Sequence, residues 1–78
     1  MASLRLFATV REAAGTGRAQ IDGATVGGVL DAAVAEYGSE FAQLLPVCRI
    51  WVNGKTATHE TEVSNDDEVA LLPPVSGG

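Results

Sequence analysis

A chain of 78 residues can form one small domain and is too short for two. Its ten acidic and five basic side chains give a net charge of −5, which favours partners with basic surfaces over nucleic acid, because Lys and Arg supply most of the affinity for phosphates. One cysteine excludes an internal disulfide framework, and no apolar run reaches the roughly 20 residues needed to cross a bilayer. We therefore expect one globular domain in the cytoplasm, with no metal site and no nucleic-acid or membrane partner.

The first apolar segment alternates in the manner of a half-buried strand. Every second position of residues 3–10 is apolar, which predicts one strand over this range. Phe7 is an aromatic side chain on the opposite face, and is either incidental or part of a docking patch. Residues 11–17 are expected to form a loop. The sequence Gly15-Thr16-Gly17 lacks both the third glycine and the lysine of phosphate-binding loops, so we exclude a nucleotide site there.

A helix is predicted after a short second strand over residues 18–22. Thr25 is a suitable N-cap, and Gly38 is well placed to stop the helix. The apolar positions between them recur at helical spacing: Val26, Val29, Leu30, Ala33, Val34 and Tyr37. Glycines at positions 27 and 28 weaken the first turn, and would allow close packing against the sheet. A second apolar cluster over residues 41–45, before Pro46, predicts a short helical turn that closes the core.

Residues 47–53 form the clearest strand pattern in the sequence. The pair Asn53-Gly54 favours a type I′ hairpin turn, so residues 55–57 should return as a further strand. Cys48 shares the inward face of the pattern and is interpreted as a small core residue. Trp51 is on the outward face, like Phe7, and two outward aromatic residues strengthen the hypothesis of a docking patch.

Few other residues are candidates for a catalytic or binding role. His59 has no second histidine or triad-like arrangement near it and is interpreted as a solvated loop residue. The acidic run Asp66-Asp67-Glu68 is either a solvated turn or, because it precedes the C-terminal segment, a contact for basic residues of a partner.

The C-terminal segment is the main candidate for function. Residues 69–72 read as a buried strand, and Pro73-Pro74 must end it because proline cannot donate to a strand ladder. Gly77 and Gly78 follow, and glycine offers little to a core but lets the backbone enter a narrow channel. The alternatives at this point are an idle tail and an end whose carboxylate is presented to another protein.

The order of predicted elements fits an α+β roll of the ubiquitin type, with about four to five strands packed on one main helix. Residues 68–78, the opening residues 6–15 and the triplet at 52–54 resemble the small subunit of molybdopterin synthase, a ubiquitin-like sulfur carrier. The diproline favours this carrier over the related thiamine carrier. One departure is Asp66, where the family usually has glycine, and this leaves the geometry of that turn open.

The resemblance implies a β-grasp domain over residues 1–72, with the last strand beside the first, and a free tail over residues 73–78. It implies that Gly78 is the chemical site, as a carried reagent in a non-catalytic subunit. An ATP- and Mg²⁺-dependent activating enzyme would adenylate Gly78, a sulfur-donor protein would supply sulfur, and the large synthase subunit would receive the thiocarboxylate. No cofactor would be bound permanently. The tail residues that would enter the partner are Pro73, Pro74, Val75, Ser76 and Gly77.

The docking surface expected beside the tail comprises Phe7, Trp51 and Leu72, the first by family similarity and the others by pattern. Three alternatives stay open from the sequence. The chain could carry sulfur for another pathway, such as thiamine or cysteine synthesis. It could be a ubiquitin-like modifier that joins Gly78 to lysines, or an interaction module with an idle tail.

Overall fold

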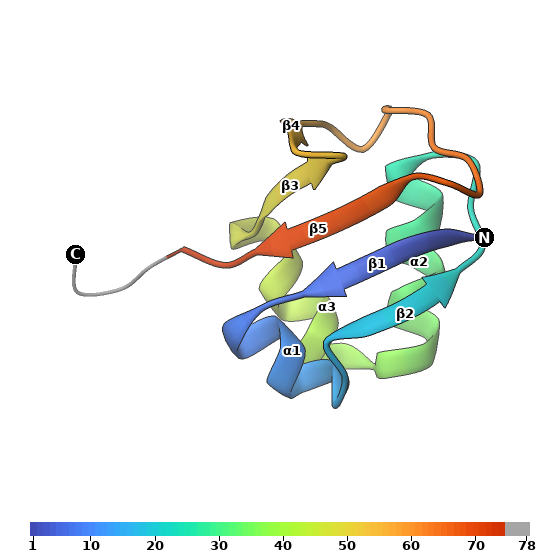
Figure 1. The fold of residues 1–78 in the computed structure, drawn as a ribbon. Helices are drawn as coiled ribbons and strands as arrows, with labels where there is room; N and C mark the ends of the chain where they lie inside the picture. Colours follow the sequence, from blue (N-terminus) through green and yellow to red (C-terminus); the bar gives the residue numbers. More distant parts are fainter. Residues whose placement is uncertain (75–78) are drawn as a thin grey trace.

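A five-stranded mixed sheet with the strand order β2-β1-β5-β3-β4 forms the frame of the chain, and the helices cover one of its faces (Figure 1). The structure is a computed structural model and describes residues 1–74. The strands are β1 (Ala2–Leu6), β2 (Arg18–Ile21), β3 (Arg49–Val52), β4 (Lys55–Thr56) and β5 (Glu68–Leu72). The helices are α1 (Ala8–Ala14), α2 (Val26–Tyr37), α3 (Ser39–Leu44) and the 3₁₀ turn η1 (Leu45–Val47). None of these helices is long and apolar enough to cross a membrane.

The first and last strands lie side by side at the centre of the sheet. They pair in parallel, whereas β2 pairs with β1, β3 with β5 and β4 with β3 in antiparallel fashion. Leu4, Leu6, Val69 and Leu71 on these two strands are almost completely buried against the helices. The arrangement confirms the ubiquitin-like roll and the placement of the last strand beside the first.

The prediction of one strand over residues 3–10 is wrong. Strand β1 ends at Leu6, Phe7 is extended, and Ala8 has a positive φ of 53° that turns the chain into α1. Most of the loop predicted for residues 11–17 is therefore helix, which ends at Gly15 with a φ of 78°. The pattern misled because Leu6 and Val10 are four residues apart, a spacing that fits both a strand and a helix, and both residues are buried.

Helix α2 confirms the predicted caps. The Thr25 hydroxyl accepts a hydrogen bond from the Gly28 amide at 3.1 Å, and the helix ends at Gly38. The residues of α2 that face the core are Val26, Val29, Leu30 and Ala33. Phe41 on α3 is fully buried and contacts Tyr37 edge to face, with ring centroids 5.2 Å apart, so the second apolar cluster does close the core.

Gly27 at the start of α2 allows a loop, not the sheet, to approach. The amides of Val26 and Gly27 donate to the carbonyls of Thr61 and His59, each at 2.9 Å. A Cβ at Gly27 would lie 3.2 Å from the His59 carbonyl oxygen, closer than side chains normally pack. Loop carbonyls thus satisfy two of the free amides at the helix N-terminus.

The β3–β4 hairpin forms as predicted. Asn53 and Gly54 both have positive φ, 51° and 82°, as a type I′ turn requires. The returning strand is shorter than expected, because β4 stops at Thr56 although the Ala57 amide still donates to the Ile50 carbonyl at 2.9 Å.

Candidate functional site

The C-terminal segment leaves the domain from a central strand. Strand β5 is hydrogen-bonded to β1 on one side and to β3 on the other, and its inward side chains Val69 and Leu71 are fully buried. Pro73 is half-buried and Pro74 is exposed. Figure 1 shows the chain passing beyond the sheet at this end of β5. The core therefore fixes the start of the tail, while residues 75–78, which include the predicted sites Val75, Ser76, Gly77 and Gly78, lie outside the described residues.

The outer face of the sheet, which we define as the face turned away from the helices, carries two of the three predicted docking residues. Directly paired strand residues point to the same face, so Trp51 shares this face with its partner Ala70, and Leu72 shares it with its partner Arg49. Both Trp51 and Leu72 are half-buried and not fully exposed. The Trp51 indole Nε1 is enclosed and has no hydrogen-bond partner among residues 1–74.

Phe7 also lies beside the outer face, although its backbone is not part of the sheet. It is the N-cap of α1 and not a strand residue, and the Arg5 guanidinium lies 5.3 Å from the centre of its ring. Arg5 pairs with Ala70 and so belongs to the outer face. The structure therefore brings Phe7, Trp51 and Leu72 to one side of the domain, at or beside the sheet from which the tail departs.

A hydrogen-bonded cluster fixes the turn before β5. The Asp67 carboxylate accepts from the Asn53 side-chain amide and from the Ser64 backbone amide, both at 2.8 Å, and the Glu68 amide donates to Asn53 Oδ1 at 2.9 Å. These bonds, that from Asn53 foremost, hold the pKa of Asp67 below its usual range. Local sequence patterns do not predict this cluster, because they indicate Asn53 only as a turn residue and leave the acidic run as either a solvated turn or a contact for a partner.

The turn also accommodates the departure at Asp66. Among the described non-glycine residues, only Ala8 and Asn53 have a positive φ, so Asp66 adopts a conformation that any residue can take. Glycine is therefore not needed at this position.

Asp67→Asn is expected to destabilise the domain at pH 7, because an amide cannot accept both bonds as strongly. A carboxylate with a lowered pKa stabilises the fold above its unfolded pKa of about 3.9, and this contribution is lost as the pH falls through the folded value. The difference in melting temperature between wild type and variant should therefore shrink below about pH 4. Asp66→Asn, which removes the same charge one residue away, should show a much smaller difference at every pH. A difference in melting temperature between wild type and Asp67→Asn that stays constant from pH 7 to pH 3 would contradict this prediction.

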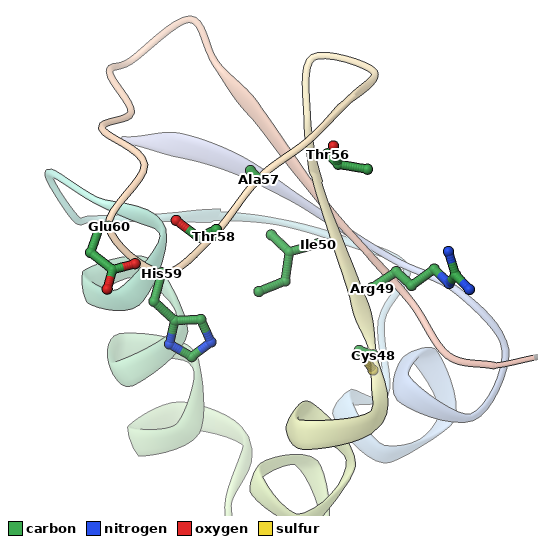
Figure 2. A pocket seen from close by; sticks show the side chains of 8 residues that line it. All are labelled: Cys48, Arg49, Ile50, Thr56, Ala57, Thr58, His59 and Glu60. Carbon is green, nitrogen blue, oxygen red and sulfur yellow. The ribbon is translucent and has the colours of Figure 1, made fainter.

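An open groove of about 650 Å³ lies between β3, β4 and the loop that follows β4 (Figure 2). Its lining includes Cys48 and His59, and Figure 2 shows these two side chains at separate ends of the groove. The Cys48 thiol donates to the Leu44 carbonyl at 3.2 Å, and burial raises its pKa, so it stays protonated and unreactive at neutral pH. In the part of the chain that the structure describes, no three His, Cys, Asp or Glu side chains are grouped to hold a metal ion.

Comparison with known proteins decides the family. Residues 4–78 match the model of the ThiS family, a match that covers nearly the whole chain and includes the terminal glycines. The chain belongs to the ThiS family. This membership confirms the resemblance to ubiquitin-like sulfur carriers. It does not distinguish the small subunit of molybdopterin synthase from other carriers of the family.

The similar proteins include archaeal modifier proteins and a subunit of a molybdopterin-converting factor. Small archaeal modifier protein 1 of Haloferax volcanii is 38% identical over 84 aligned positions, covering 95% of this chain and 97% of the relative. A crystal structure of that modifier protein superimposes with a TM-score of 0.82 at 35% identity, over 97% of each chain. A complex of subunits 1 and 2 of the molybdopterin-converting factor from Helicobacter pylori gives a TM-score of 0.71 at 26% identity, with 99% of this chain and 97% of that chain covered.

Proposed function

We propose that this ThiS-family chain carries sulfur as a thiocarboxylate at Gly78, and that it does so as the small subunit of molybdopterin synthase. The observation that carries the proposal is the family match, which extends through the terminal glycine. The strand that precedes the tail, β5, lies at the centre of the sheet. Within residues 1–74, burial keeps the Cys48 thiol protonated, and no three His, Cys, Asp or Glu side chains are grouped to hold a metal ion.

The chemistry starts from an unreactive group. A carboxylate is ionised at neutral pH and is a poor electrophile. In the proposed sequence, an activating enzyme uses ATP with Mg²⁺ to form an acyl-adenylate at Gly78 and releases pyrophosphate. Hydrosulfide supplied by a sulfur-donor protein then attacks the carbonyl carbon of Gly78, the C–O bond to AMP breaks, AMP leaves, and the thiocarboxylate remains. The chain itself supplies the reacting carbonyl and no catalytic side chain.

The tail is suited to delivery into a buried site. Six extended residues, from Pro73 to Gly78, reach at most about 20 Å. Two prolines restrict the conformations of the tail and so reduce the entropy lost when it is bound. Because β5 is anchored by buried Val69 and Leu71, the tail begins at a fixed point of the domain.

The proposed acceptor is cyclic pyranopterin monophosphate, bound by the large synthase subunit. The Helicobacter pylori structure is a complex of two converting-factor subunits, and this supports a partner subunit for the present chain. The test is reconstitution of the thiocarboxylated chain with the large subunit encoded in the same genome. Formation of molybdopterin, with one carboxylate regenerated per sulfur transferred, would support the assignment. A thiocarboxylated chain that converts no pterin in this assay would exclude it.

A protein-modifier function is the second candidate, and the names of the archaeal relatives favour it. In that case an amine would attack the activated Gly78 and form an amide, with AMP as the leaving group. Lys55 is the only lysine of this chain and is exposed, so conjugates between two copies would use Lys55 or the N-terminal amine. Mass spectrometry of the chain expressed in its own cells distinguishes the two. Isopeptide-linked Gly78 on other proteins supports the modifier, whereas thiocarboxylate without such adducts excludes it.

A further inference from the structure

The outer face of the sheet carries a charge opposite to that of the whole chain. Arg18 pairs directly with Arg5 and Arg49 pairs directly with Leu72, so three arginines share the face with Trp51 and Leu72. Glu68 pairs with Ser3 and is the one acidic residue that points outward from the described strands. The described strands thus place on this face three of the five basic side chains of the chain and one of its ten acidic side chains.

The fold gains little stability from these charges beyond the contact between Arg5 and the Phe7 ring. Within residues 1–74 the one ion pair joins Arg5 to Glu68 at 3.9 Å, and both side chains are about 40% exposed, so solvent weakens it. Arg18 and Arg49 are exposed and have no carboxylate within 4.0 Å in that part of the chain. Like charges directly opposite each other on neighbouring strands, as in Arg5 and Arg18, destabilise a sheet.

We propose that the outer face docks on an acidic surface of a partner protein, with Arg5, Arg18 and Arg49 surrounding the apolar contact made by Phe7, Trp51 and Leu72. Guanidinium groups bind carboxylates through two parallel hydrogen bonds, which fixes orientation as well as proximity. Leu72 and Arg49 lie at the end of the sheet from which the tail departs, so such a contact would also aim the tail. The inference rests on the proposed function, because the partner is the activating enzyme that adenylates Gly78.

The net charge of −5 by itself favours a basic partner, and the structure reverses that expectation for this face. The remaining surface is acidic and accounts for the net charge. A nucleic acid is disfavoured because three arginines on an acidic domain provide few phosphate contacts. An acidic protein surface satisfies all three arginines without the overall repulsion that a polyanion would meet.

The first experiment measures association of the chain with the activating enzyme from the same genome. Arg18→Glu and Arg49→Glu should each weaken binding by about 3- to 10-fold at low ionic strength, mainly through a slower association rate. The loss should shrink in 0.5 M salt, because the Debye length there is only a few ångströms. Lys55→Glu is the matched control, since it makes the same charge change at an exposed position whose strand partner, Val52, faces the helices, and it should bind as wild type. Equal weakening by all three variants, or none by the sheet variants, would overturn the proposal.

A second experiment does not depend on the proposed function. The ¹⁵N-labelled chain is titrated with poly-L-glutamate, and separately with single-stranded DNA of matched charge. Amide shifts confined to β1, β2, β3 and β5 and stronger for poly-L-glutamate support the acidic protein surface. Stronger amide shifts with DNA than with poly-L-glutamate would overturn the proposal in favour of nucleic acid. Shifts on α2, or no shifts with either polymer, would overturn it outright. Dimerisation of the free chain would overturn it by assigning the face to a second copy. If poly-L-glutamate causes these amide shifts but Gly78 cannot be loaded with sulfur, the proposed function is rejected and the docking surface is not.

Discussion

Replacing Gly23 by alanine is expected to lower the free energy of unfolding by about 3 kcal/mol, a large part of the stability of a small domain. A Cβ at Gly23 would lie 2.5 Å from the Val29 amide nitrogen and 2.9 Å from the Gly28 carbonyl carbon. Both contacts are with backbone atoms, so the first turn of α2 would have to move away from the preceding chain. Urea or thermal unfolding followed by circular dichroism measures the change.

Gly28→Ala provides the matched control, because it adds the same methyl group to the other side of this contact. A Cβ at Gly28 would meet Thr25 Oγ1 at 3.5 Å and Gly23 Cα at 3.6 Å, which are ordinary packing distances. Alanine also favours a helix over glycine by up to about 1 kcal/mol. This variant should therefore be as stable as wild type or more stable. If the two variants melt at the same temperature, the close packing assigned to Gly23 is wrong.

Deleting Gly78 is expected to abolish sulfur transfer while leaving the melting temperature unchanged. The truncated chain still ends in a glycine carboxylate, but its reach is shorter by about 3.5 Å, and a misplacement of even 1 Å can cost about 100-fold in rate. Residues 1–74 contain every described strand and helix, so the fold should not respond. The assay is molybdopterin formation with the large subunit, alongside a melting curve.

The control for this deletion keeps the length of the tail. Ser76→Ala changes one side chain in the same segment and keeps the number of residues between β5 and the terminal carboxylate, so we expect it to retain most activity. A Gly78 deletion with near-normal transfer, or with a large loss of stability, would contradict the role of Gly78 as a carried reagent.

Local patterns predicted the elements whose signals lie close together in the sequence. The cap at Thr25, the stop at Gly38 and the Asn53-Gly54 turn each depend on a few neighbouring residues, and the structure confirms all three. The error over residues 3–10 has the same origin, because the spacing of Leu6 and Val10 fits two secondary structures. Only the positive φ at Ala8, which the sequence does not reveal, decides between them.

The features that local patterns could not predict depend on contacts between distant segments. Asn53 and Asp67 are 14 residues apart, and their hydrogen bond exists because β3 pairs with β5. The arginines at positions 5, 18 and 49 belong to three strands, and only the observed register places them on one face. The strand order itself came from the family resemblance and not from periodicity.

The central claim is that Gly78 carries sulfur, and the intact mass of the protein tests it most directly. The full-length chain is incubated with its activating enzyme, ATP, Mg²⁺ and a sulfur source, and its mass is then measured with and without ATP. We expect an ATP-dependent increase equal to the replacement of one oxygen by one sulfur, located at Gly78 by fragmentation. An unchanged mass with an activating enzyme that is active in pyrophosphate exchange on this chain would contradict it.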